Sequence, residues 1–268
     1  MTLTATKIDT EVIIVGAGPV GLITALLLAQ KGITSILLEQ CPEIIQSPRA
    51  MAYGPAAVHE LERAGIAEEC RAVGMEPSDY EFTLRWITID NKLVAELPTR
   101  LMEEEYPPVL CGQHEVAKII LGRLGGFPEL CRVFWSHKVV EVEQDEERVT
   151  VMCEVDGRQK KFTGDYVVGA DGARSSVRKL LGCSFDGFTY DKMVVATNVF
   201  YPFREYGFAA GQFIIHPEHF AMVCTRWRAL VPKSLSHFIF DRWVNGCLRS
   251  ARSHQMVCTA SRTARTQT

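Results

Sequence analysis

Residues 11–40 read EVIIVGAGPVGLITALLLAQKGITSILLEQ, and this stretch decides the fold. Residues 11–15 are short, β-branched and followed by glycine, which predicts a buried strand. Residues 20–30 are rich in Leu and Ala and stop at Lys31-Gly32, as a helix does. Residues 35–38 form a second apolar run. Two such runs joined by a helix predict a parallel pair of strands in a buried sheet.

Gly16, Gly18 and Gly21 form a G-x-G-x-x-G motif between the first strand and the helix. Gly16 permits a tight turn, Gly18 lets a pyrophosphate approach the backbone, and Gly21 lets helix and strand pack closely. The helix N-terminus then offers unpaired N–H groups to phosphates. Glu39 ends the second strand, where it can accept hydrogen bonds from ribose hydroxyls and repels a 2′-phosphate. The motif therefore predicts FAD or NAD rather than NADP; the alternative is a glycine-rich turn without a ligand.

Composition limits the class of protein. The chain has 268 residues, of which 47% are hydrophobic and 23% charged, as in a folded globular protein. A formal charge of −3 gives no reason to expect nucleic-acid binding. The nine cysteines are odd in number and contain no C-x-x-C pair, which favours reduced thiols in the cytoplasm. Residues 12–29 are apolar enough to suggest a membrane segment, but their glycines and Pro19 favour a turn, so we expect no span.

The rest of the chain alternates between strand and helix patterns, and we find no internal repeat. Asp156-Gly157 predicts a hairpin turn between strands at 149–155 and 159–162. The other predicted helices are 56–64, 116–124 and 176–181, and the other predicted strands are 82–89, 93–97, several within 133–155, 166–169, 193–200 and 213–215.

Residues 167–178, VVGADGARSSVR, carry a second signal. An apolar strand runs into Asp171-Gly172 and then into a helix capped by Ser175 or Ser176. An Asp at the carboxyl end of a strand, beside a bound dinucleotide, can contact ribose or ribityl hydroxyls. The alternative is an Asp-Gly turn followed by an ordinary helix cap.

Together, residues 12–40 and 167–182 resemble the two FAD fingerprints of the class A flavoprotein monooxygenases, the family of para-hydroxybenzoate hydroxylase and phenol hydroxylase. The resemblance covers residues 11–224. It implies an α/β fold with a Rossmann-like FAD-binding domain and parallel sheet, plus an incomplete β-rich substrate domain. Arg49 matches an arginine that the family carries in a loop near the flavin, and Gln113 matches a helix-start glutamine that contacts FAD. The alternatives are a solvated loop charge and an ordinary helix N-terminal residue.

The resemblance also implies an activity. The family binds FAD, receives hydride from NADPH or NADH as a transient co-substrate, and transfers one oxygen atom of O2 to an aromatic or related small organic substrate, in some members in specialised (secondary) metabolism. The flavin carries this chemistry, so we expect no catalytic amino acid. His216 and His219 are separated by a proline and lack a third ligand, so we expect no metal.

The resemblance implies discontinuous domains. Residues 1–80 and 106–185 would form the FAD-binding domain, and residues 81–105 and 186–224 a partial substrate domain. Residues 225–268 are basic and biased in composition, so we expect a disordered tail; binding to an anionic surface is the alternative.

The sequence departs from the family in one motif. The family's Gly-Asp segment, which precedes a helix over the flavin, has no counterpart, because Gly164-Asp165 lies just before a predicted strand. We therefore expect the chain to be truncated at its C-terminus relative to that family. Besides the monooxygenase, a truncated non-catalytic FAD-binding or interaction protein stays open. So does an NAD-dependent dehydrogenase, which the segment around Asp171 disfavours. The pattern predicts neither the substrate nor the oligomeric state.

Overall fold

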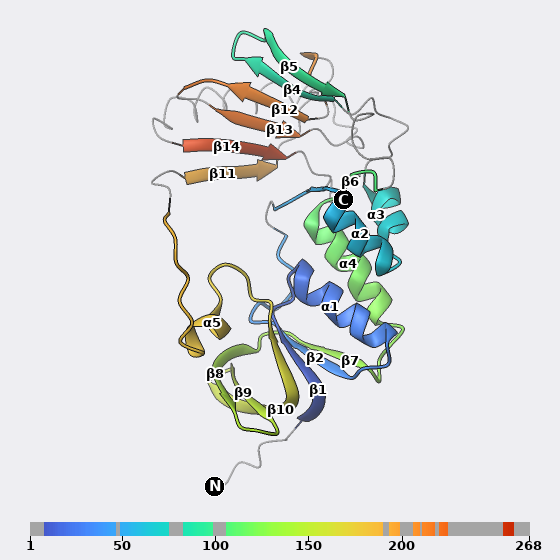
Figure 1. The fold of residues 1–268 in the computed structure, drawn as a ribbon, viewed down its shortest axis with the longest axis vertical. Coiled ribbons are helices and arrows are strands. Elements are labelled where there is room, and N and C mark those ends of the chain that lie inside the picture. Colours follow the sequence, from blue (N-terminus) through green and yellow to red (C-terminus); the bar gives the residue numbers. More distant parts are fainter. Residues whose placement is uncertain are drawn as a thin grey trace, which may run out of the picture. The chain divides into compact units, whose positions relative to one another are not determined.

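The computed structural model describes residues 8–46, 49–74, 83–98, 106–189, 193–198, 206–209, 211–217, 220–224 and 254–259. The chain divides into two compact units, each with its own sheet (Figure 1). Unit 1 comprises Met1–Ser47, His59–Cys70 and Gly112–Gly187, and unit 2 comprises Pro48–Val58, Arg71–Cys111 and Phe188–Thr268.

Unit 1 contains a six-stranded mixed sheet in the order β7-β2-β1-β10-β9-β8. Strands β7, β2, β1 and β10 run parallel, while β9 is antiparallel to both β10 and β8. Its strands are β1 (Ile8–Val15), β2 (Ser35–Leu38), β7 (Cys131–Phe134), β8 (Lys138–Gln144), β9 (Val149–Val155) and β10 (Arg158–Gly169). The parallel pairing predicted for β1 and β2 is confirmed, as is the α/β class of the fold.

The core of unit 1 follows from the apolar run that forms β1. Ile13 and Ile14 point to opposite faces of the sheet, and both are fully buried. The Ile13 side packs with Leu38, Phe162 and Val177. Val177 belongs to α5 (Ser176–Leu180), and the two longer helices, α1 (Pro19–Gln30) and α4 (Gln113–Leu124), pack against each other. Both helices begin at the same end and run side by side (Figure 1).

The hairpin predicted at Asp156-Gly157 is confirmed. Both residues have positive φ, 49° and 71°, as a two-residue turn between β9 and β10 requires. The prediction of separate strands at 159–162 and 166–169 is wrong, because β10 is continuous through Gly164. Gly164 pairs with the neighbouring strands like the residues around it. A side chain is excluded there because a Cβ would lie 3.0 Å from Ile13 Cγ1. The absent side chain thus serves close packing, and no turn forms.

Two short helices and one pair of short strands lie between residues 52 and 110. Helix α2 (Pro55–Arg63) was predicted, with bounds one residue later. Helix α3 (Ala67–Val73) was not, because its seven residues carry only two buried side chains, Ala67 and Cys70. The short strands β3 (Ala52–Tyr53) and β6 (Val109–Leu110) pair antiparallel.

Unit 2 contains the second six-stranded sheet, in the order β11-β14-β13-β12-β4-β5. Its strands are β4 (Thr83–Thr88), β5 (Leu93–Pro98), β11 (Met193–Asn198), β12 (Gly211–Ile215), β13 (Ala221–Cys224) and β14 (His254–Thr259). Trp86 on β4 stacks on Phe213 of β12, with ring centroids 5.3 Å apart and planes 10° apart. All of the partial substrate domain predicted from 81–105 and 186–224 except residues 186 and 187 falls within this unit, and its bounds stay a prediction.

Strand β14 lies inside the segment 225–268, for which the sequence predicts disorder. For its six residues that prediction is wrong. The segment HQMVCT carries no charge at neutral pH and pairs in parallel with both β11 and β13, so its order comes from strands more than thirty positions away in sequence. The rest of the predicted tail lies outside the described residues.

Candidate nucleotide site at the carboxyl edge of the sheet

Both sequence motifs lie at the same edge of the sheet in unit 1. β1, β2 and β10 are parallel neighbours, so the loops that follow them leave from one edge. Two backbone hydrogen bonds join these loops: Gly16 donates to the Leu38 carbonyl at 2.8 Å, and Ala170 donates to the Val15 carbonyl at 2.8 Å. The carboxyl edge of a parallel sheet is where open α/β folds bind nucleotides.

Gly16 and Gly21 are required by packing within the protein. Gly16 has φ +105°, and a Cβ there would lie 2.6 Å from the Ala170 carbonyl oxygen. A Cβ on Gly21 would lie 1.9 Å from the Gly16 carbonyl oxygen. The glycine-rich loop therefore packs directly against residue 170, next to the second motif. This confirms that the two motifs meet, although their contact with a ligand stays a prediction.

Gly18 differs from the other two glycines because no close contact among the described residues requires a glycine there. Its backbone is extended, with φ −72° and ψ 175°, and the nearest atom to a Cβ would be the Ala170 oxygen, 4.0 Å away. It is the N-cap of α1 and supplies no side-chain cap; the first turn contains Pro19 and no acid. The first N–H groups of α1 are thus left for an external acceptor. This uncapped, open helix start fits a phosphate group.

Glu39 lies beside the glycine-rich loop. Its Oε2 accepts a hydrogen bond from the Ala17 N–H at 2.7 Å, and its Oε1 accepts one from the Cys41 N–H at 2.8 Å. The side chain is half-buried. Burial, and then the hydrogen bond and charge of Glu39, raise the pKa of the Cys41 thiol. Each carboxylate oxygen has a further lone pair with which it can accept a hydroxyl proton.

Asp171 uses only one of its two oxygens within the protein. Oδ2 accepts from the backbone N–H groups of Ser176 (2.5 Å) and Val177 (3.2 Å) at the start of α5. Among the residues that the structure describes, Oδ1 is buried and has no hydrogen-bond partner. Such an orphaned acceptor fits a ligand hydroxyl. Of the two predicted caps, Ser175 and Ser176, the first is the N-cap of α5, and Ser175 Oγ accepts from the Arg178 N–H at 2.9 Å.

The remaining two predicted residues are placed differently. Gln113 is the first residue of α4, after an N-cap glycine that offers no side-chain cap, and it is half-buried. Arg49 lies in the loop before β3, is exposed, and belongs to unit 2. The structure therefore brings five of the seven predicted residues to one edge and sets a sixth at the start of the helix beside α1. Those five are Gly16, Gly18, Gly21, Glu39 and Asp171.

Two backbone groups of this edge escaped the sequence analysis, namely the Ala17 N–H and the Ala170 carbonyl. No residue type marks them, since every residue carries these groups.

Across the described ranges no three His, Cys, Asp or Glu side chains gather as metal ligands, and His219 lies outside those ranges. In the same ranges no helix has both the length and the apolar character to cross a membrane.

Known proteins resemble the chain over most of its length. A family model described as FAD binding domain matches residues 9–260, which extends past residue 224, where the sequence analysis ended the resemblance. Para-nitrophenol 4-monooxygenase of Pseudomonas sp. strain WBC-3 is 35% identical over 215 residues, covering 79% of this chain and 52% of that protein. The 6-hydroxy-3-succinoylpyridine 3-monooxygenase of Pseudomonas putida is 31% identical over 216 residues, covering 80% and 54%.

The fold comparison agrees with these relatives. The crystal structure of p-nitrophenol 4-monooxygenase from Pseudomonas putida is similar with a TM-score of 0.73 and 26% identity, covering 92% of this chain and 64% of that one. The chain spans about half the length of the curated relatives it matches. Because the family model matches nearly the whole sequence, and the two motifs meet at one sheet edge, the chain belongs to the FAD binding domain family of the class A flavoprotein monooxygenases.

Proposed function

We propose that this chain binds FAD at the carboxyl edge of the unit 1 sheet and serves in the NAD(P)H- and O2-dependent hydroxylation of an aromatic ring. One observation carries the proposal. The same edge holds an uncapped helix start, open at Gly18, and a buried, unpartnered oxygen of Asp171. A ligand that fits both must carry phosphates and hydroxyls, as FAD does. Membership of the family supports FAD over NAD.

Different residues of this sheet edge would contact different groups of the ligand. The N–H groups of Gly18, Val20 and Gly21 would hold the pyrophosphate, because Pro19 has none. Glu39 would accept from the ribose hydroxyls, and Oδ1 of Asp171 from a further hydroxyl of the ligand. Gln113 and Arg49 stay proposed contacts. Bound FAD would supply hydride acceptance and O2 activation, and the protein's part is to bind and orient it.

The names of the relatives support a substrate class. One is a monooxygenase of para-nitrophenol, one of 6-hydroxy-3-succinoylpyridine, and others are hydroxylases of 3-(3-hydroxyphenyl)propionate. Each of these compounds is a six-membered aromatic ring that carries a hydroxyl group, which enriches the ring in electrons. We propose a substrate of this kind and assign its binding to the sheet of unit 2. A role in specialised metabolism is a further proposal. So is a cytoplasmic location, which the six free cysteines described support.

Flavin binding tests the proposal through Gly18. A Gly18→Ala variant should fold normally, because its Cβ would meet nothing closer than 4.0 Å, yet it should fill the space that a pyrophosphate needs. We expect its FAD affinity to fall about tenfold or more, measured by the absorbance and fluorescence of titrated FAD. Gly122→Ala, on α4 with nothing within 4 Å of its Cβ, is the matched control and should bind like the wild type. Equal affinity of the two variants would contradict the proposed site.

Turnover tests the reaction. We expect the flavin-loaded chain to oxidise NADPH or NADH in air when a hydroxylated aromatic ring is present, and mass spectrometry to show one added oxygen atom in the product. Bound flavin without hydroxylation of any such ring would favour the non-catalytic FAD-binding alternative. Binding of NAD in place of FAD would favour the dehydrogenase.

A further inference from the structure

We propose that Glu39 positions the glycine-rich loop for phosphate before a nucleotide arrives, by holding the N–H of Ala17. This role acts through the backbone and is separate from the contact between Glu39 and the ribose. The inference rests on the proposed function, because it takes the carboxyl edge to be the nucleotide site.

Glu39 is itself fixed by its neighbours on the sheet. Its N–H donates to the Phe134 carbonyl at 2.9 Å, and its carbonyl accepts from the His137 N–H at 2.7 Å. The turn that it starts is held as well, since Ser136 donates to the Cys41 carbonyl at 3.0 Å. The carboxylate that reaches Ala17 therefore extends from an anchored backbone and ties the loop after β1 to the loops after β2 and β7.

This tie determines which N–H groups remain for a phosphate. The Gly16 N–H is taken by the Leu38 carbonyl at 2.8 Å, and the Ala17 N–H by Glu39 at 2.7 Å. Pro19 carries no N–H. With the peptide of residues 16 and 17 fixed on Glu39, the next peptide, which carries the Gly18 N–H, is held in one orientation at the start of α1. Preorganised donors bind an anion more tightly than a loop that must be ordered on binding.

Charge and position predict opposite effects when Glu39 is removed. A carboxylate beside a phosphate site repels the phosphate, so by charge alone its loss should strengthen phosphate binding. If Glu39 positions the loop, its loss should weaken phosphate binding despite the relief of repulsion. The sign of the change therefore distinguishes the two effects, provided that the ligand lacks the hydroxyls that Glu39 could contact.

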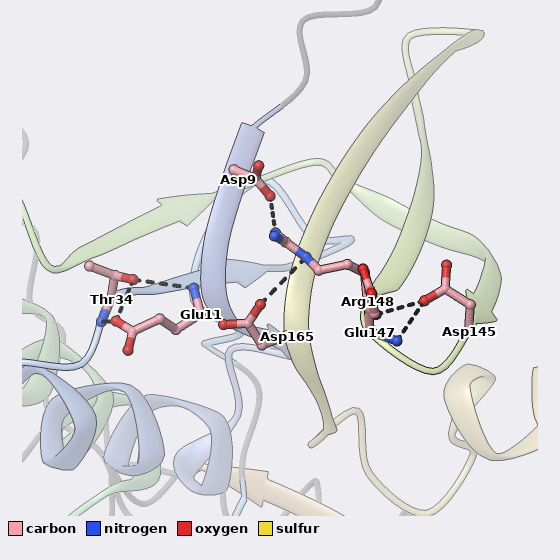
Figure 2. Close-up of polar contacts among 7 residues, drawn as sticks. All are labelled: Asp9, Glu11, Thr34, Asp145, Glu147, Arg148 and Asp165. Atoms are coloured by element: carbon pink, nitrogen blue, oxygen red, sulfur yellow. Dashed lines mark hydrogen bonds and ion pairs between the residues drawn. The ribbon is translucent and has the colours of Figure 1, made fainter.

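Two probes and three variants separate these roles. ADP carries both ribose hydroxyls, and 2′,3′-dideoxy-ADP carries neither. Glu39→Ala removes both acceptors, and Glu39→Gln keeps one acceptor for the two N–H groups. Glu11→Gln is the matched control, because the Glu11 carboxylate also ties β1 to the start of β2, accepting from the Thr34 N–H and hydroxyl at 2.7 Å (Figure 2). It lies before the apolar part of β1, away from the glycine-rich loop.

We expect Glu39→Ala to weaken 2′,3′-dideoxy-ADP about three- to tenfold, Glu39→Gln to weaken it less, and Glu11→Gln to leave it unchanged. Calorimetry gives these affinities. Loss of affinity for ADP with unchanged or stronger binding of the dideoxy compound would overturn the proposal and leave Glu39 as a ribose contact only.

Amide hydrogen exchange gives a readout that needs no ligand. In the wild-type chain the Ala17 amide should exchange slowly, and Glu39→Ala should speed it by about tenfold while circular dichroism and melting temperature show a folded protein. Unchanged exchange at Ala17 would overturn the positioning role. If the wild type binds neither FAD nor these nucleotides, the proposed function fails, and the exchange result still decides what Glu39 does to the loop. If Glu39→Ala does not fold, Glu39→Gln carries the same comparison.

Discussion

The guanidinium of Arg148 donates a hydrogen bond to the carboxylate of Asp9, which precedes it by 139 residues in the chain (Figure 2). Arg148 leads into β9 and Asp9 lies on β1, two strands that are separated in the sheet by β10. On β10, Asp165 Oδ1 lies 3.4 Å from the same arginine's Nε. One side chain therefore connects three strands of the unit 1 sheet.

Removing this contact should cost little stability. Arg148 and Asp9 are 37% and 51% exposed, so solvent and salt screen their attraction. A double-mutant cycle with Arg148→Gln and Asp9→Asn, followed by urea unfolding, should give a coupling free energy of about 0.2–1 kcal/mol. The coupling should shrink when salt is raised to about 1 M. A coupling that persists at high salt would mean that packing, and not charge, joins these strands.

Gly16 and Gly18 should respond differently to the same substitution. Gly16→Ala should destabilise the fold by about 2 kcal/mol or more, since it combines a left-handed backbone with a Cβ 2.6 Å from the Ala170 oxygen. Gly18→Ala should change the free energy of unfolding by less than about 0.5 kcal/mol. Chemical denaturation of both variants checks this difference, and equal destabilisation would show that the loop is packed differently.

Asp171 and Ser175 both cap α5, but only Asp171 keeps an oxygen for a ligand. Ser175→Ala should cost about 1 kcal/mol of unfolding free energy and leave FAD affinity intact. Asp171→Asn can still cap the helix through its amide oxygen, but it replaces the orphaned acceptor with an N–H2 donor. We expect it to be nearly as stable as the wild type and to bind FAD at least about tenfold more weakly. Thermal melts and FAD titrations on the same samples separate the two effects.

The cysteines should differ in reactivity. Burial raises the pKa of the Cys153 thiol to about 12, so it stays protonated and unreactive at neutral and mildly alkaline pH. Cys183 is exposed. A maleimide added to the folded chain should label Cys183 in minutes and leave Cys153 unlabelled until denaturant is added, as peptide mapping would show. Rapid labelling of Cys153 would indicate that the β9 side of the core opens easily.

The turn before β9 should make stability depend on acid pH. Backbone N–H groups of Glu147 and Arg148 hold the pKa of Asp145 below its usual value. Because the folded-state pKa is the lower one, the stabilisation is present above the unfolded-state pKa of about 4 and is lost as pH falls through the folded-state pKa. Asp145→Asn keeps an acceptor without the charge. The melting temperatures of wild type and variant should converge as pH falls below about 4.

The elements that the sequence predicted best are those decided by local pattern. The β1–α1–β2 unit follows from two β-branched runs, a leucine-rich helix and the glycines between them, and the structure places all three where expected. The hairpin between β9 and β10 could be predicted from Asp156-Gly157 alone, because these two residue types favour the positive φ that the turn requires.

The elements that it missed depend on partners distant in the chain. Strand β14 is ordered by pairing with β11 and β13, and β10 is continuous because Gly164 packs on Ile13. The site shows the same division. Glycines and acids at strand ends mark Gly18, Glu39 and Asp171 in the sequence, whereas no pattern shows that Glu39 accepts from Ala17, or that one Asp171 oxygen caps a helix while the other is unpartnered.

The position of β1 between β2 and β10 also sets an order of events during synthesis. β1 and β2 leave the ribosome early, but β10, the neighbour on the other side of β1, is made more than a hundred residues later. Until then one edge of β1, whose second half is wholly apolar, is uncovered, a state in which nascent chains associate wrongly or need a chaperone. Asp171 emerges just behind β10, so the cofactor site proposed above would be complete only after this late strand is in place.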